Sequence, residues 1–248
     1  MKLNDAAVLF VEDEPFLRES MGGWLEQQVG RALCAEHGEA ALAILAANRI
    51  DLLLSDVRMP VMDGIALVGK LREFAAPPRV ILVTGFSDLT LRQAYELGVD
   101  TIFEKPVDRD ELLRVMQNSL SDPADLWRQP SQTEAAMKLS ASFPSLAAAL
   151  NQADIAFGRR GFCIKSPALL YEGPVDFVVT FTSDQRVLSG QGVVRWIDQQ
   201  EGQAGIEITC LEDAYRTWAL DLIKAKAGIE FVPGSLTPRT PPASPAPS

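Results

Sequence analysis

Polar side chains stand where four short apolar segments of the first half of the chain end. Glu12 and Asp13 follow AAVLFV, Asp56 closes DLLLSD, Thr84 closes RVILVT, and Lys105 follows DTIFE. Carboxylates from two such segments can hold a hard divalent cation such as Mg²⁺, which prefers oxygen ligands and keeps several waters. A lysine and a hydroxyl beside them can bind phosphoryl oxygens. These residue types therefore predict a site for phosphoryl transfer, which needs mostly positioning and charge neutralisation.

The side chains can meet only if the apolar segments are neighbouring strands of one sheet. The segments are apolar on both faces, which is typical of buried parallel strands, and RALCAE at 31–36 is a weaker fifth strand. Stretches with helical spacing lie between them, at 15–29, 38–48, 63–75, 88–98 and 108–120. Five such repeats predict an α/β doubly wound five-stranded parallel sheet. Functional groups gather at the carboxyl ends of the strands in such a sheet.

Four motifs then connect the first half to a known family. The segments VLFVEDEP, LLLSDVRMPVMDG, ILVTG and FEKP, which occur in this order within residues 6–120, closely resemble the flavodoxin-like receiver domain of two-component response regulators. The resemblance implies that Asp56 is the phospho-acceptor. It also implies that Glu12, Asp13 and Asp56 bind Mg²⁺, with the backbone carbonyl of Arg58 as a further ligand.

The resemblance assigns roles to two other strand ends. Lys105 would pair with the phosphoryl group, and Thr84 would move towards it. The cis-proline that follows the lysine in this family would be Pro106. This chain departs from the family at Ile102, because receivers commonly carry an aromatic residue three positions before the lysine. Phe103 is next along and is expected to face the opposite side of the strand.

The same resemblance sets the expected partners and activity. A sensor histidine kinase would phosphorylate the receiver. Mg²⁺-dependent self-phosphorylation from small donors and slow self-dephosphorylation are the only catalysis expected, so the chain is not otherwise an enzyme. Receivers often pair through their fourth helix, fifth strand and fifth helix, which leaves a homodimer open.

Composition limits the other functions of the chain. Residues 1–120 hold 12 Lys and Arg against 19 Asp and Glu, and the remainder holds 11 against 14. Neither part has the basic surplus that DNA binding normally requires, so no DNA partner is expected. The three cysteines are widely spaced and His37 is the only histidine, which predicts neither a disulfide framework nor a zinc site. Without a long apolar run or a signal peptide, we expect a cytoplasmic protein with no membrane insertion.

The pattern changes after residue 120. Pro, Ser and Asp mark 121–134 as a linker, and 135–152 is predicted to be helical with an interruption at Pro144. Residues 160–210 have strand-like segments separated by Gly-, Asp- and Gln-rich turns, and 212–226 is an amphipathic helix. The sequence thus predicts a receiver domain at 1–120, a small β-barrel domain with flanking helices at 135–228, and a largely disordered tail at 229–248.

The second domain resembles a PilZ domain. The resemblance rests on the segments IAFGRRGFCIKS, LLYEGPVDFVVTF, VLSGQGVVRWID and QAGIEITCLEDAYRTW. It depends on pattern more than on invariant residues, so an unrelated small interaction barrel remains the alternative. Trp196 and Trp218 are expected in the barrel core and in helix packing.

Many PilZ domains bind cyclic di-GMP, but the usual motifs are degenerate here. The family motif Asp/Asn-x-Ser-x-x-Gly, aligned on Gly161, places Gly158 at the serine and Ala156 at the acid. The second motif, Arg-x-x-x-Arg, is missing because 129–154 contains no arginine. The pair at 159–160 is expected to be two solvated arginines in a turn. Cyclic di-GMP is therefore not an expected ligand.

Three functions remain to be compared. The leading hypothesis is a response regulator whose PilZ-like domain acts on an unidentified protein target and not on DNA. The alternative is a two-input sensor that binds cyclic di-GMP by a non-standard mode. A transcription factor with an unrecognised DNA-binding half is the third, and the acidic balance counts against it.

Overall fold

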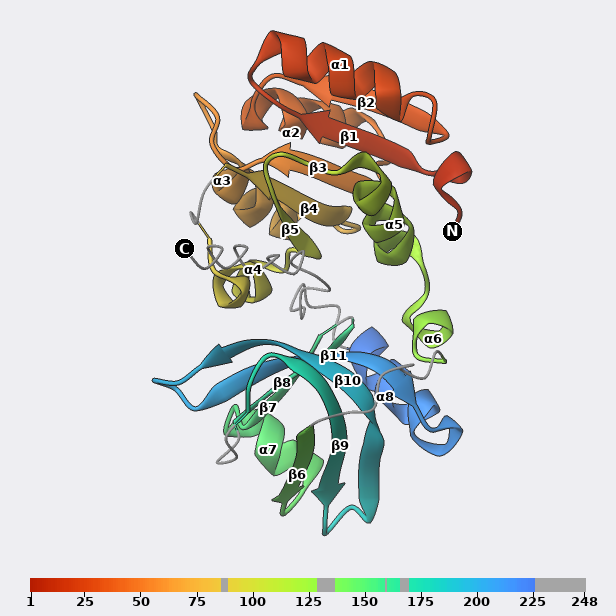
Figure 1. The fold of residues 1–248 in the computed structure, drawn as a ribbon, viewed down its shortest axis with the longest axis vertical. Coiled ribbons are helices and arrows are strands. Elements are labelled where there is room, and N and C mark those ends of the chain that lie inside the picture. The colour runs from red at the N-terminus through yellow and green to blue at the C-terminus, as the bar shows by residue number, and fades with distance from the viewer. Residues whose placement is uncertain (86–88, 129–136, 159, 166–169, 226–248) are drawn as a thin grey trace, which may run out of the picture.

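The computed structural model describes residues 1–85, 89–128, 137–158, 160–165 and 170–225 of the 248-residue chain. The described strands form two sheets, and the two lie in separate bodies (Figure 1). Residues 129–134 of the predicted linker and the predicted tail at 229–248 lie outside the described residues. In the described part of the chain, no helix has the combined length and apolarity needed to cross a bilayer.

The N-terminal sheet has five parallel strands, as predicted. Its strand order is β2-β1-β3-β4-β5. The register aligns Asp56 with Val83 and Thr84 with Glu104, so the carboxyl ends of neighbouring strands are nearly level. The strands are β1 (Ala7–Val11), β2 (Arg31–Ala35), β3 (Leu52–Asp56), β4 (Arg79–Thr84) and β5 (Thr101–Glu104).

Helices cover both faces of this sheet, because successive side chains of a strand point to opposite faces. Leu9 and Val11 pack on one face with residues of α2, α3 and α4, and Val8 and Phe10 pack on the other with residues of α1 and α5. The helices are α1 (Pro15–Leu25), α2 (Gly38–Ala47), α3 (Gly64–Lys70), α4 (Leu91–Leu97) and α5 (Arg109–Leu120), with short 3-10 turns at Leu3–Asp5 and Leu71–Glu73. The sheet is therefore doubly wound.

The C-terminal sheet has six strands in the order β6-β9-β10-β11-β8-β7. β6 pairs parallel to β9, and the other neighbours are antiparallel. Its strands are β6 (Met137–Phe143), β7 (Ile155–Gly158), β8 (Gly161–Lys165), β9 (Gly173–Phe181), β10 (Arg186–Asp198) and β11 (Gln203–Leu211). The helices are α6 (Pro123–Leu126), α7 (Leu146–Asn151) and α8 (Asp213–Ala225).

The helix predicted from residue 135 is wrong in its first half, where the chain forms strand β6. Met137 and Leu139 point into the core and Lys138 and Ser140 are exposed. This alternation has the period of two that a half-buried strand requires, and it overrides the helical propensity of the neighbouring alanines. Among the described residues of the predicted helix, only the part after Pro144 is helical, as α7.

The second sheet curls into a half-barrel around its own core. α8 packs on the concave side, where Trp218 makes edge-on ring contacts with Phe157 and Phe181. Trp127, which directly follows α6, is fully buried in the same core. The prediction for Trp218 is confirmed, whereas Trp196 lies outside this core, in a small cluster with Cys163.

Candidate functional site

The carboxyl ends of β1 and β3 bring three acidic side chains together. Ligand oxygens of Glu12, Asp13 and Asp56 all lie within 4.8 Å of one another. Glu12 and Asp56 are buried, whereas Asp13 is exposed. Two buried carboxylates this close repel each other unless a cation lies between them. The cluster therefore has the oxygen donors and the charge that a hard divalent cation prefers.

Lys105, just past the end of β5, supplies a cation to this cluster. Its Nζ donates to Asp56 Oδ2 at 2.6 Å and to Glu12 Oε2 at 3.0 Å. The lysine side chain is about a third exposed, so its ammonium group sits at the rim of the site. Because Glu12 and Asp56 are buried, it can turn away from them only when another cation takes its place.

Burial and charge shift two pKa values in the site. Burial raises the pKa of Glu12 above its usual value, and the nearby Asp56 carboxylate adds to the rise, while Lys105 opposes it. For Lys105, burial acts to lower the pKa, but hydrogen bonds to Asp56 and Glu12 outweigh it and raise the pKa. A cation bound beside Glu12 would therefore favour the ionised form of this carboxyl group.

The loop between β1 and α1 is held by an arginine that the sequence analysis did not select. Arg18 Nη1 donates to the backbone carbonyl of Glu12 at 2.7 Å and to that of Asp13 at 3.0 Å. An arginine one turn into a helix that follows an acidic loop is the signal that could have identified it. Its two hydrogen bonds orient the acidic pair.

The loop between β3 and α3 folds back onto the end of β3. Asp63 caps α3 by accepting from Ala66 N at 2.7 Å. Gly64 N donates to the carbonyl of Val57 at 2.9 Å, and a Cβ at Gly64 would collide with the backbone carbonyl of Asp56. A glycine is therefore required where the helix approaches the acidic strand end.

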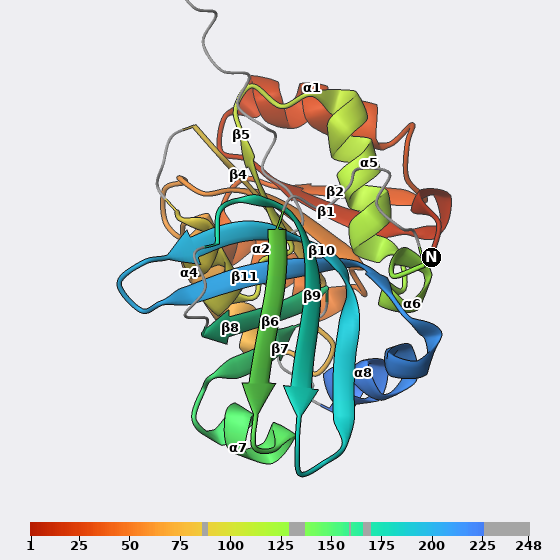
Figure 2. The ribbon, with the colours of Figure 1, turned by 60° about the horizontal axis from the view of Figure 1, so that its bottom comes forward.

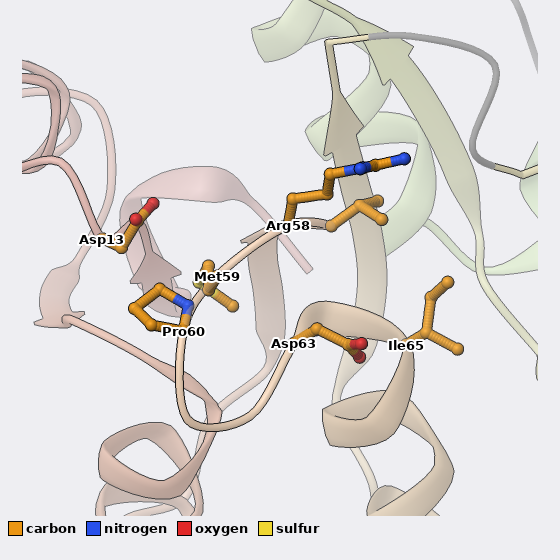
Figure 3. Close-up of a pocket in the computed structure, with 7 residues that line it drawn as sticks. Asp13, Arg58, Met59, Pro60, Asp63 and Ile65 are labelled. Carbon is orange, nitrogen blue, oxygen red and sulfur yellow. The ribbon is translucent and has the colours of Figure 1, made fainter.

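An open cavity of about 550 Å³ lies beside Asp13 and this loop. Figure 3 shows Asp13 on one side of the cavity and the loop with Arg58 and Pro60 on the other. Its lining residues are Asp13, Val57, Arg58, Met59, Pro60, Asp63 and Ile65. Because it is open, water and a small phosphorylated group can enter from solvent.

The remaining predicted site residues lie on the two neighbouring strands. Thr84 is buried at the end of β4, and its carbonyl accepts from Lys105 N at 2.8 Å. The peptide bond before Pro106 is cis, as the resemblance implied. Ile102 and Phe103 pack in different cores on opposite faces of the sheet, as expected, so no aromatic ring occupies the Ile102 position.

A second charged cluster lies on the C-terminal sheet and was missed from the sequence. Glu207 on β11 is buried; it accepts a hydrogen bond from Arg195 Nε at 2.8 Å and forms an ion pair with Arg160 Nη2 at 2.7 Å. Arg160 was predicted to be solvated, but its side chain is only 12% exposed. The register places Glu207 opposite Val193, close to Arg195 on the same strand. Opposite charges on adjacent strands were the signal for this cluster. The residue at 159 lies outside the described part of the chain.

The comparisons with known proteins agree on the first domain. Residues 8–117 match the family of response regulator receiver domains. Together with the parallel sheet and the acidic strand ends, this match defines the N-terminal domain as a receiver domain.

Relatives of known name match this chain over about half its length. The transcriptional regulatory protein GlrR of Escherichia coli (strain K12) is 29% identical over 144 residues, which cover 56% of this chain and 32% of that protein. The transcriptional regulatory protein CrdR of Helicobacter pylori is 33% identical over 122 residues, which cover 48% of this chain and 57% of that protein. The chain therefore spans less than two thirds of either relative.

Among solved structures, a CheY-like response regulator receiver domain from Methylobacillus flagellatus is similar to this chain. It is 30% identical, covers 46% of this chain and 98% of its own, and has a TM-score of 0.43.

Proposed function

We propose that the chain is a response regulator whose Asp56 accepts a phosphoryl group from a sensor histidine kinase. The supporting observation is the cluster of Glu12, Asp13 and Asp56 with Lys105 Nζ 2.6 Å from Asp56. Asp56 stands at the end of the central strand β3 and already has a cation at one oxygen. It is therefore the carboxylate best placed to receive a phosphoryl group.

Mg²⁺ is the proposed cofactor, held by Glu12, Asp13, Asp56 and the backbone carbonyl of Arg58. These oxygen donors suit a hard cation, and the raised pKa of Glu12 is the strain that such a cation would relieve. When bound, Mg²⁺ would offset the repulsion between the acidic site and an incoming phosphoryl group.

In the proposed transfer, a carboxylate oxygen of Asp56 forms a bond to phosphorus. The bond between phosphorus and the donor atom breaks, and the donor leaves with the electron pair. Lys105 turns from the carboxylate towards the phosphoryl oxygens, and the Thr84 hydroxyl moves towards them. The residues act by positioning and neutralisation, so no proton needs to move in this step.

Acetyl phosphate with Mg²⁺ tests the proposal, since it supplies a phosphoryl group without a kinase. Intact-protein mass spectrometry should show one acid-stable, alkali-labile phosphoryl group on the wild-type chain and none on Asp56→Asn. Asp63→Asn is the matched control, because Asp63 lines the same cavity and an asparagine keeps the helix cap. Equal phosphorylation of Asp56→Asn would refute the assignment of Asp56.

For the second part of the chain, we propose a PilZ-like output domain over 135–228 that follows a receiver at 1–120. Its action would be protein–protein interaction in the cytoplasm. Support comes from the half-barrel closed by α8 and from the ionic cluster, since Arg160 and Arg195 both engage Glu207. Neither arginine is therefore left to grip an anionic nucleotide, and Ala156 replaces the acid of the usual motif.

Two rival outputs can be tested with the same protein. GlrR and CrdR are named as transcriptional regulatory proteins, which favours a transcriptional output, although those relatives are matched over only about half of this chain. A gel shift with genomic DNA fragments, before and after phosphorylation, should show no complex. A calorimetric titration with cyclic di-GMP should show no heat, and micromolar binding would establish the two-input sensor instead.

A further inference from the structure

The C-terminal sheet has two edge strands of different length. β7 has four residues and contacts the helices α7 and α8. β6 has seven residues, and among the described strands it pairs only with β9 (Figure 2). A long, flat edge strand offers its unpaired backbone groups to another strand unless a covering element, a bulge or an inward charge prevents it. β6 is therefore the edge on which such protection matters most.

The described residues of β6 carry little of this protection. Every residue of the strand pairs in register with β9, so no bulge twists the edge away. The one charged side chain, Lys138, points outward beside Asp176 of β9. Although α7 contacts β6, the outward side chains at 138, 140 and 142 are exposed. The side chains that point into the sheet's core are all apolar: Met137, Leu139, Ala141 and Phe143.

One hydrogen bond shows which residues of β6 face the open edge. Thr182 N donates to the carbonyl of Phe143 at 3.0 Å, and Phe143 pairs with Phe181. The N–H and C=O of Phe143 therefore point towards β9, and this direction alternates along an extended strand. Three residues consequently direct both backbone groups away from β9: Lys138, Ser140 and Ser142.

The sequence of β6 is complementary to itself about Ser140. In an antiparallel pair with a twofold axis at Ser140, Lys138 lies opposite Ser142 of the second copy and Ser140 lies opposite its own copy. These are the residues that face the edge, so each pair exchanges both backbone hydrogen bonds. On the core side Leu139 lies opposite Ala141, so apolar side chains meet across the junction. No backbone group of the three residues is left unpaired.

We propose that β6 is a homodimerisation edge, on which a second copy of this chain pairs its own β6 antiparallel. Charge favours this orientation, because a parallel, in-register pair would place two Lys138 ammonium groups side by side. In the antiparallel pair each Lys138 keeps Asp176 as its neighbour and faces a serine. One strand from each copy makes a small contact, so a dissociation constant in about the micromolar range is expected. The pairing does not depend on phosphorylation of Asp56.

Sedimentation equilibrium on the full chain between about 1 and 100 μM tests the proposal. Wild type should form dimers. Ser140→Lys places two ammonium groups opposite each other at the axis, so the dissociation constant should rise by at least about fivefold. Val178→Lys is the matched control, because Val178 is exposed and in register with Ser140 but lies one strand in from the edge. Its dissociation constant should match that of wild type.

Two results would overturn the second copy as the occupant. A wild-type chain that is monomeric over the whole range would leave the edge to a strand of another protein. A dimer that Ser140→Lys leaves intact would be formed by another surface, such as the receiver domain.

Ser140→Pro tests whether backbone hydrogen bonds hold the two copies together. The proline removes an N–H that points away from β9, which edge strands tolerate, so urea denaturation should show a folded chain. In the dimer it removes two hydrogen bonds at the axis, and the dissociation constant should rise by at least about tenfold. A folded Ser140→Pro chain that dimerises like wild type would refute the pairing.

Disulfide formation tests the position of the axis in a chain carrying Cys34→Ser, Cys163→Ala and Cys210→Ser. Opposed residues of a hydrogen-bonded pair have Cα atoms about 5.5 Å apart, within the range of a disulfide. Copper-catalysed oxidation should therefore link Ser140→Cys chains into covalent dimers. The Val178→Cys control should not be linked, because its two copies lie three strand spacings apart, about 14 Å. Equal rates of linking by the two variants would overturn the axis at Ser140.

Discussion

The two charged clusters of the molecule have the same plan with the charges reversed, and they differ in solvent access. In the receiver domain one ammonium group, on Lys105, bonds to the carboxylates of Glu12 and Asp56. In the second sheet one carboxylate, on Glu207, bonds to the guanidinium groups of Arg160 and Arg195. The first cluster has surplus negative charge and a partly exposed central group. The second has surplus positive charge and a buried central group.

This difference suits the first cluster to exchange its central cation and the second cluster to stabilise the sheet. A central group at the rim of a site can be replaced by another cation or can follow a phosphoryl group. A central group enclosed between strands cannot leave without stranding its partners, which is costly. A glycine lies beside each cluster: Gly64 against the Asp56 carbonyl and Gly161 against the Ile206 carbonyl.

The largest effect is expected for Glu207→Leu. Removing the shared carboxylate leaves two arginines facing each other on a covered surface, which should lower the free energy of unfolding by about 3 kcal/mol. Urea denaturation followed by tryptophan fluorescence measures the loss. Glu201→Leu, at an exposed turn position, is the control and should change little. Similar stability of the two variants would show that the second cluster is not a support.

A smaller effect is expected at the glycine beside the first cluster. Gly64→Ala forces a methyl group against the Asp56 backbone, so stability should fall by about 2 kcal/mol and phosphorylation by acetyl phosphate should slow. Gly69→Ala in the same helix meets nothing within 4 Å. That variant should gain about 0.5 kcal/mol, since alanine is the better helix former. Loss of stability in both variants would point to the helix and not to the site.

Lys105→Met tests whether the central group of the first cluster is exchangeable. The variant loses the cation that competes for Asp56 and Glu12, so Mg²⁺ should bind about tenfold more tightly, a change of about 1.4 kcal/mol. Isothermal titration calorimetry with MgCl₂ measures this affinity. Lys70→Met, on the exposed side of α3, is the control. Weaker Mg²⁺ binding by Lys105→Met would mean that the lysine organises the cation site.

The smallest effect concerns pH without Mg²⁺. Because folding raises the pKa of Glu12, the folded state holds this proton more tightly than the unfolded state. Above the ordinary glutamate pKa of 4.5, the free energy of unfolding contributed by Glu12 should fall as pH rises through the folded pKa. Wild type and Glu12→Gln, compared by urea denaturation over this range, should differ in slope, whereas Glu19→Gln on exposed α1 should match wild type. A difference that is constant with pH would contradict the shift.

The receiver half could be predicted from sequence because its signals are local. Each functional side chain directly follows an apolar segment, and parallel strands bring their carboxyl ends together. Arg18 was missed because its partners are backbone carbonyls, so the sequence marks it only by its position one turn into the helix after the acidic loop. In the second half, the parallel partner of β6 is β9, more than 30 residues along the chain, and no local pattern specifies such a pairing.

The cluster around Glu207 shows the same limit. Its arginines come from a hairpin turn and from an irregular position of β10, where the register shifts between Val194 and Trp196. A bulge of this kind changes which side chains share a face, so alternation along the strand misassigned Trp196 to the core. The burial of Trp196 outside the main core of the sheet has no counterpart in the sequence of β10.

The short junction between the domains affects how strong the contact between α4 and β10 must be. Only Ser121 and Asp122 separate the end of α5 from α6, and Trp127 is buried in the second core with its carbonyl bonded to Leu211 N at 3.0 Å. So short a tether gives an effective local concentration in about the millimolar range or above. A contact too weak to detect between separate molecules would therefore be largely formed within the chain, and a modest loss of affinity would be enough to open it.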